Sequence, residues 1–179
     1  QVGNIEISTL YLLHSGKTGG SAFNTKNAAI TKFSDLTIDN PWNGFYGETQ
    51  NTLLVEDSLI TNVKGAAAFK LFDDAAGAPS ARTDGVTINN LIIACAYNSG
   101  TDGFVADGPV YAIAAFRLNI LACRDNFALL NTAVSTTRYP SFYNVFDLEI
   151  DGASRRSVYF GGAKNVYLDN PEISNTSGA

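Results

Sequence analysis

Three acidic residues recur a short distance after an aromatic residue. Glu48 and Asp107 each follow a phenylalanine by three positions, and Asp73 follows one by four. In a strand, a three-residue step places the acid on the opposite face from the aromatic ring, so an inward ring implies an outward acid. If the three segments stack as neighbouring strands, adjacent carboxylates lie about 5 Å apart and alternate ones about 10 Å apart.

Paired carboxylates at such distances are the groups that hydrolyse glycosidic bonds. Retaining enzymes hold two carboxyl groups roughly 5.5 Å apart, and inverting enzymes hold them about 6.5–9.5 Å apart. Crowded carboxylates also raise one another's pKa, which keeps one of them protonated as a general acid. Glu48, Asp73 and Asp107 are therefore our candidate catalytic residues. The alternative is that they are solvated acids that end strands and cap turns.

Aromatic and basic residues in the longer polar segments are candidates for holding a sugar. Trp42 stands in "DNPWNG", Tyr97 in "ACAYNSGTDG", and Arg138 and Tyr139 in "NTAVSTTRYPS". Like the longest insertion, residues 73–85, these segments interrupt the apolar pattern, and loops on a rigid scaffold tend to carry function. We expect these four residues to bind substrate, with aromatic rings as stacking platforms. For Trp42 the alternative is packing at a corner of the chain.

A second set of polar residues precedes the aromatic residues by two positions. Asn43, Asp102 and Asp125 share the face of the inward rings on this count. Such residues are typical of corners, where their side chains bond to turn amides. We expect a structural role for them.

The cysteines and the histidine offer little further chemistry. Cys95 and Cys123 fall one register position apart in similar apolar runs, and we expect buried thiols stacked in the core rather than a disulfide. His14 is the only histidine, and the chain has no CxxC pair. These residues are too few for a zinc site, so we expect no metal and no cofactor.

The elements that must position these residues repeat along the whole chain. Short apolar runs built on a leucine recur every 23 to 32 residues. A second run around an aromatic residue follows each of them, and a third run precedes the next leucine. Turns rich in Gly, Asn, Asp and Ser separate the runs, and no useful stretch has an apolar face of helical period. The leucines are Leu10, Leu36, Leu59, Leu91, Leu118 and Leu148.

Three short strands per repeat predict an all-β solenoid. We expect a parallel β-helix of about seven coils, in which each strand pairs with its equivalent one coil away. Residues 1–179 then form a single β-helix domain. A β-sandwich or jelly roll also has many short strands, but it explains less well why three kinds of run return in the same order.

Two motifs that lead into the next repeat, "DGVTINN" and "KNVYLDN", resemble the right-handed parallel β-helices of the pectate-lyase-like superfamily. Within that superfamily, the irregular coils and the alanine-rich "VYAIAAF" most resemble a bacteriophage tailspike or a related depolymerase. This resemblance implies a right-handed helix, a polysaccharide partner, a homotrimer, and a location outside the cell or in a virion tail. It does not decide the chemistry, because such folds host hydrolases, lyases, epimerases and inert shafts.

Composition excludes several other classes of protein. The net charge is −5, and Lys and Arg are scattered apart from Arg155-Arg156, so we expect no nucleic-acid surface. No apolar run approaches the length of a membrane span. The chain has no Met and begins with Gln1, so we expect a processed chain or a fragment of a longer one.

The function we expect is recognition and hydrolysis of a bacterial cell-surface polysaccharide by paired carboxylates. A lyase is the weaker enzymatic option, because no Lys, Arg or Tyr stands beside an acid cluster as a base. The competing expectation is a non-catalytic structural shaft or adhesin module, whose coils present a binding face or a trimer contact.

Overall fold

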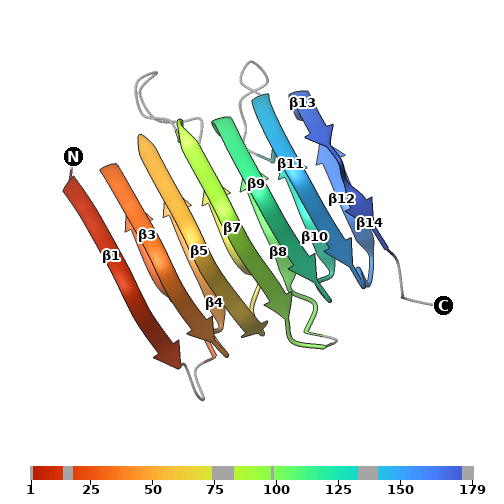
Figure 1. The fold of residues 1–179 in the computed structure, drawn as a ribbon, viewed down its shortest axis with the longest axis horizontal. Coiled ribbons are helices and arrows are strands. Elements are labelled where there is room, and N and C mark those ends of the chain that lie inside the picture. The colour runs from red at the N-terminus through yellow and green to blue at the C-terminus, as the bar shows by residue number, and fades with distance from the viewer. Residues whose placement is uncertain (1, 14–17, 74–82, 98, 133–140, 175–179) are drawn as a thin grey trace.

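The computed structural model describes residues 2–13, 18–73, 83–97, 99–132 and 141–174, and Figure 1 shows them coiled into one elongated solenoid. All regular elements in these ranges are β-strands, and the two ends of the chain lie at opposite ends of the solenoid. The strands are β1 (Val2–Leu13), β2 (Ser21–Lys26), β3 (Ala28–Asp39), β4 (Asn43–Glu48), β5 (Thr52–Val63), β6 (Ala67–Phe72), β7 (Val86–Cys95), β8 (Asp102–Asp107), β9 (Tyr111–Leu121), β10 (Asp125–Leu130), β11 (Ser141–Asp151), β12 (Arg156–Gly161), β13 (Lys164–Asp169) and β14 (Glu172–Ile173).

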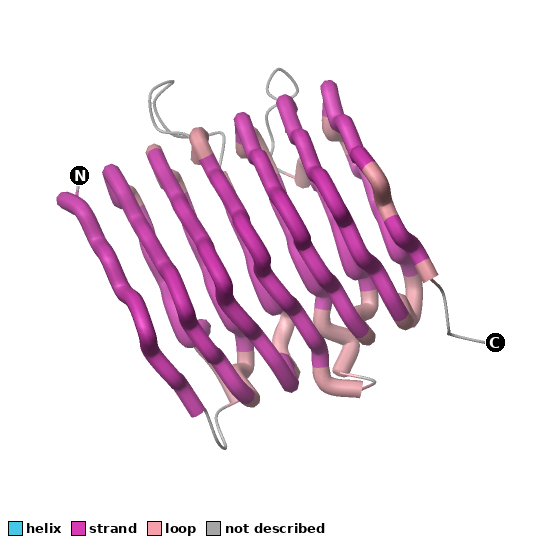
Figure 2. Tube along the Cα trace, viewed as in Figure 1, coloured by secondary structure: helices cyan, strands magenta, loops and turns pink. Residues whose placement is uncertain are grey.

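Two parallel sheets make the walls of the solenoid. The long strands form one sheet in the order β1-β3-β5-β7-β9-β11-β13, with β14 also on β11, and the short strands form the other in the order β2-β4-β6-β8-β10-β12. Each turn contributes one long and one short strand, so each strand lies beside its equivalent one turn away (Figure 2). The expected parallel β-helix is confirmed, and its six short strands mark about six turns, close to the seven coils expected.

The third and first apolar runs of the repeat form one continuous long strand. A residue in the left-handed conformation bends that strand at its middle, with φ between 44° and 60°. This conformation costs most residues free energy but suits Asn and Asp, which explains why they are common at this position. The bend also resets the alternation of side chains. As a result, the residue two positions before the corner and the residue directly after the corner both point into the core. The corner residues are Thr9, Asp35, Asp57, Asn90, Arg117 and Asp147, and Asn170 takes the equivalent position between β13 and β14.

Equivalent side chains stack in columns to make the core. On the short sheet, the phenylalanine column is in register, and its inner ring centroids lie 4.7 to 5.4 Å apart. This distance is close to the spacing of neighbouring strands, so each coil contributes one ring and the rings stack from coil to coil. The column consists of Phe23, Phe45, Phe69, Phe104 and Phe127, and it faces aliphatic columns that include Leu91, Leu118, Leu148, Ile93, Ile120 and Ile150.

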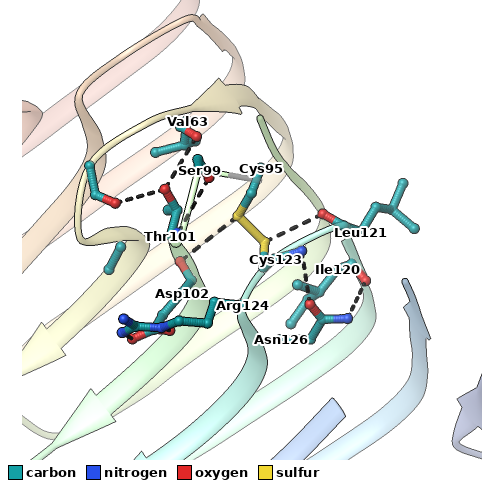
Figure 3. Close-up of a disulfide and its surroundings, with 12 residues drawn as sticks. Val63, Cys95, Ser99, Thr101, Asp102, Ile120, Leu121, Cys123, Arg124 and Asn126 are labelled. Carbon is teal, nitrogen blue, oxygen red and sulfur yellow. Dashed lines mark hydrogen bonds and ion pairs between the residues drawn. A yellow bond between two sulfur atoms is a disulfide. The ribbon is translucent and has the colours of Figure 1, made fainter. Parts of the chain in front are cut away.

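A disulfide joins two consecutive coils, so the expectation of free thiols is wrong. Cys95 and Cys123 are bonded, with their Cα atoms 5.0 Å apart (Figure 3). Cys95 ends β7, whereas Cys123 lies beyond the end of β9, after Ala122 with a φ of 57°. Counting along a straight strand therefore misplaced Cys123, because the left-handed residue turns the chain and brings its side chain to Cys95.

Candidate functional site

The predicted column of carboxylates is interrupted by a phenylalanine. Glu48 is in register with Phe72, and Phe72 is in register with Asp107. The two acids are thus two coils apart, or about 10 Å between Cα atoms. The ring between them packs against Tyr46, at a centroid distance of 6.5 Å, and the Lys70 ammonium lies 5.2 Å from its centre.

Asp73 lies one position beyond that column. Because successive residues of a strand point to opposite faces, this single step turns its side chain away from Glu48 and Asp107. Asp73 is only 2% exposed, and its Oδ2 accepts a hydrogen bond from the backbone N–H of Thr83 at 2.7 Å. Its carboxylate thus anchors the chain where it returns to the long sheet.

The other two predicted acids also bind neighbouring residues. Glu48 forms an ion pair with Lys26 from the preceding coil. Asp107 is 4% exposed and accepts hydrogen bonds from the backbone N–H of Thr132 at 2.9 Å and from its hydroxyl at 2.6 Å. The catalytic assignment of Glu48, Asp73 and Asp107 stays a prediction, but all three have structural partners.

The predicted substrate-binding residues do not form one cluster in the described chain. Trp42 is partly buried at a corner, where its carbonyl accepts a hydrogen bond from the N–H of Gly65. Tyr97 is 88% exposed in the segment after β7. Arg138 and Tyr139 lie outside the described residues.

The second polar column, Asn43, Asp102 and Asp125, lies at corners as expected, but its two acids bind arginines and not turn amides. Asn43 Oδ1 accepts a hydrogen bond from the backbone N–H of Ala66 at 2.8 Å, as predicted. Asp102 instead binds the Arg124 guanidinium through both oxygens, at 2.8 and 2.7 Å (Figure 3). The carboxylate of Asp102 therefore accepts hydrogen bonds from an arginine of the following corner and not from the backbone amides of its own turn.

Asp125, one coil further along, is held by two arginines. Its carboxylate is almost fully buried and forms ion pairs with Arg155 and Arg156. Burial opposes ionisation of Asp125, but the hydrogen bonds and charges of the two arginines outweigh it and lower the pKa from 3.8 to about 2. Arg156 also lies over the Tyr159 ring, 3.5 Å from its centre. This network of ion pairs joins the start of β10 to the corner that precedes β12.

An open groove of about 400 Å³ lies on the outer face of the long sheet, and we call it the corner groove. Two outward positions supply its polar lining. The first is the left-handed corner itself, and the second is the residue two places further along each strand. The corner supplies Asn90, Arg117, Asp147 and Asn170, and the second position supplies Asn119, Glu149 and Glu172.

Hydrogen bonds between coils fix the side chains at the corner. Asp147 Oδ1 accepts from Asn170 Nδ2 at 2.9 Å. The Arg117 guanidinium donates to Asn89 Oδ1 at 3.1 Å. These bonds join neighbouring coils along the solenoid axis, and they do not involve the side chains at the second position of the groove.

Glu149 and Glu172 are the distinctive pair of the corner groove. They are in register on neighbouring strands, with Asn119 in the same column one coil before. Both side chains are exposed, and neither carboxylate forms a hydrogen bond or ion pair with any residue in the described ranges. Like charges directly opposite one another destabilise a sheet. An uncompensated pair at this position is therefore a feature that packing does not explain.

Three aromatic residues, which we call the aromatic strip, border the corner groove on the same coils. Phe116 and Phe146 immediately precede the corner residues Arg117 and Asp147, and their rings stack with centroids 5.0 Å apart. Tyr167 meets the Phe146 ring edge-on at 6.1 Å and is exposed. The strip and the groove together offer flat apolar faces beside carboxylates and amides.

Sequence reasoning missed the corner groove because it measured offsets from the aromatic run. Measured from the leucine run, Glu149 and Glu172 both fall one residue after the anchor, at Leu148 and Pro171. The signal was therefore present in "DLEID" and "NPEIS".

A metal site and a membrane-spanning helix are both absent from the described residues. No group of three or more His, Cys, Asp and Glu side chains in these ranges could hold a metal ion. The same ranges contain no helix that could cross a membrane. Comparison with known proteins adds no relative, since no family model, no curated protein and no solved structure matches this chain.

Proposed function

We propose that this chain is an extracellular β-solenoid that binds a polysaccharide in the corner groove. The observation that carries the proposal is the in-register pair Glu149 and Glu172, unpaired in the described chain and bordered by the aromatic strip. Carboxylates and amides accept and donate hydrogen bonds to sugar hydroxyls, and aromatic faces stack on the apolar face of a sugar ring. The corner groove offers both kinds of contact on consecutive coils.

An extended ligand suits this arrangement better than a compact one. The two positions are both polar on three successive coils, at a spacing of about 4.8 Å between neighbouring strands, and the second position becomes Ile92 on the coil before them. A polymer lying along the axis would therefore meet similar polar groups over these three coils. The resemblance to tailspikes makes a bacterial cell-surface polysaccharide the proposed ligand, and a homotrimer the proposed assembly.

Hydrolysis of the bound chain is the catalytic part of the proposal. Glu149 and Glu172 are neighbours in register, with Cα atoms about 4.8 Å apart, which supports a role as a carboxylate pair of the kind that retaining glycosidases use. One carboxylic acid would protonate the glycosidic oxygen while the other carboxylate attacks the anomeric carbon and forms a glycosyl ester. Water would then hydrolyse this ester, with the first residue acting as base.

The disulfide supports a location outside the cell. Bonds such as that between Cys95 and Cys123 persist in oxidising surroundings and are rare in the reducing cytosol. A tail of a virion or a secreted protein meets that condition.

Polysaccharide turnover and binding test the proposal together. The protein is incubated with capsular, O-antigen and neutral plant glycans. Hydrolysis is followed as the release of new reducing ends, and binding is measured separately by calorimetry. Glu149→Gln and Glu172→Gln should each abolish turnover, and Phe146→Ala should weaken binding. Glu6→Gln is the matched control, because it makes the same change on the same sheet at the other end of the solenoid. Binding that none of the groove variants changes would contradict the site.

A non-catalytic shaft or adhesin module is the second candidate function. The observation in its favour is that Glu48, Asp73 and Asp107 all bind structural partners. A module of this kind predicts sugar binding without new reducing ends, or no binding at all. The turnover assay therefore separates the two candidates.

A further inference from the structure

Two neighbouring coils carry an aromatic residue followed directly by a charged residue at the corner. Phe116 precedes Arg117 on β9, and Phe146 precedes Asp147 on β11. Because the corner residue is left-handed, both side chains of each pair lie on the outer face of the long sheet. β9 and β11 each have a neighbouring strand on both sides, so this part of the corner groove lies within the solenoid and not at one of its ends.

The carboxylate of Asp147 has no cationic partner among the described residues. Its Oδ1 accepts a hydrogen bond from Asn170 Nδ2 at 2.9 Å, and this partner is neutral. Arg117 lies beside Asp147 in the column of corner residues, but its guanidinium donates to Asn89 Oδ1 on the preceding coil at 3.1 Å. No ion pair joins Arg117 and Asp147 in the described chain. The negative charge of Asp147 is therefore available to a ligand.

The aromatic strip beside Asp147 favours the same kind of ligand. The rings of Phe116 and Phe146 are nearly parallel, with an interplanar angle of 6°, and Phe116 is 41% exposed. The face of an aromatic ring carries partial negative charge and attracts a cation within about 6 Å of its centre. A carboxylate and an aromatic ring side by side are thus two independent features that bind an ammonium group.

The net charge of the corner groove has the same sign. Its lining holds three carboxylates, those of Asp147, Glu149 and Glu172, against the single guanidinium of Arg117. A uronic acid or a phosphate-bearing sugar would be repelled by this excess of negative charge, and a neutral sugar would gain nothing from it. Electrostatic complementarity selects partners by their charge, and here it selects a positively charged sugar.

We propose that the corner groove selects a polysaccharide whose hexosamine units carry free amino groups, and that Asp147 and the Phe146 ring recognise the ammonium. This inference rests on the proposed function and names its ligand class. An ammonium group carries a full charge and three N–H donors, and N-acetylation removes the charge. Asp147 lies two residues before Glu149, so the recognised amine and the proposed acid pair occupy adjacent parts of the groove.

Two oligosaccharides of equal length and linkage test the proposal. A glucosamine oligomer with free amines and its fully N-acetylated counterpart are titrated into the intact chain by calorimetry, at a mildly acidic pH where the amines are protonated. The amine oligomer should bind roughly tenfold more tightly, because the acetylated one forms neither the ion pair nor the cation–π contact. This difference should shrink as the salt concentration rises.

One substitution and a matched control locate the recognition. Asp147→Asn should lower the affinity for the amine oligomer about fivefold and leave the affinity for the acetylated oligomer unchanged. Asp57→Asn is the control, because Asp57 is also a corner residue and accepts a hydrogen bond from Asn90 Nδ2 at 2.8 Å, as Asp147 does from Asn170. Asp57 follows Glu56 instead of an aromatic residue and does not line the groove. Circular dichroism confirms that both variants fold.

The outcomes separate this inference from the proposed function. If both oligomers bind equally, and Glu149→Gln weakens both, the preference for amines is overturned and the groove remains the binding site. An acidic capsular glycan that binds more tightly than the amine oligomer has the same meaning. An equal loss of affinity in Asp57→Asn and Asp147→Asn would also overturn the proposal. Binding of neither oligomer overturns the amine preference, whereas the proposed function fails only if no glycan of the wider panel binds in the groove.

Discussion

Glu149 and Glu172 occupy one register position on adjacent strands, and no cation of the described residues pairs with either. A pair of like charges in register costs the fold a few tenths of a kcal/mol to about 1 kcal/mol. Replacing Glu172 by Gln should therefore raise the free energy of unfolding by about that amount, measured with urea at neutral pH. The same change should weaken sugar binding. A stability cost on Glu172→Gln would show that the pair supports the fold instead.

The disulfide should stabilise the solenoid strongly. Cys95 and Cys123 are 28 residues apart in sequence, and the disulfide that closes a loop of this length destabilises the unfolded chain by about 3.5 kcal/mol. Cys95→Ser and Cys123→Ser should each lower the free energy of unfolding by that amount, measured in urea. The double variant should match either single variant, because both lose the same bond. Wild-type stability that a reducing agent leaves unchanged would argue against the pairing.

Acid should release the arginine network at Asp125. Its folded-state pKa of about 2 lies below the unfolded value of 3.8, so its ionisation stabilises the fold above about pH 4. This stabilisation, about 2 kcal/mol, should disappear as pH falls through 2. The Asp125→Asn variant should thus be less stable than wild type at pH 7, with a difference that shrinks towards pH 2. Asp35→Asn, at an exposed corner of the long sheet, makes the same change away from the two arginines and serves as the control.

Phe142 holds a strained backbone conformation. Its φ is 65° and its side chain is 58% exposed, so the strain is not offset by burial. Asn165 takes the same left-handed conformation one coil later. Phe142→Asn should therefore raise the melting temperature by a few degrees, equivalent to about 1 kcal/mol. A lower melting temperature would mean that the Phe142 ring makes contacts worth more than the strain.

The fold was predictable because its signal repeats. Each leucine run marks a position that must point inward on each coil, and six copies of that signal specify the columns even when single coils are irregular. The predicted count of three strands per coil was wrong, because each coil has one long and one short strand. The left-handed corner joins two runs into one strand, and a single Asn or Asp in a sequence does not reveal that conformation.

The candidate site was harder to predict, because it depends on register to one residue. Asp73 misses the column of Glu48 by one position, and Phe72 takes its place. Cys123 was misplaced for the same reason, by the left-handed Ala122. Glu149 and Glu172 share a column that can be recognised by counting from the leucine run but not by counting from the aromatic run. An error of one residue leaves the core pattern intact but turns a surface side chain to the opposite face.

Calorimetry of polysaccharide binding to the wild type and to the Glu149→Gln/Glu172→Gln double variant is the decisive test of the corner groove. We predict that a bacterial surface glycan binds the wild type and that the double variant loses at least tenfold in affinity, about 1.4 kcal/mol, while Glu6→Gln binds like wild type. A double variant that folds and binds the glycan as tightly as the wild type would contradict the assignment of the corner groove.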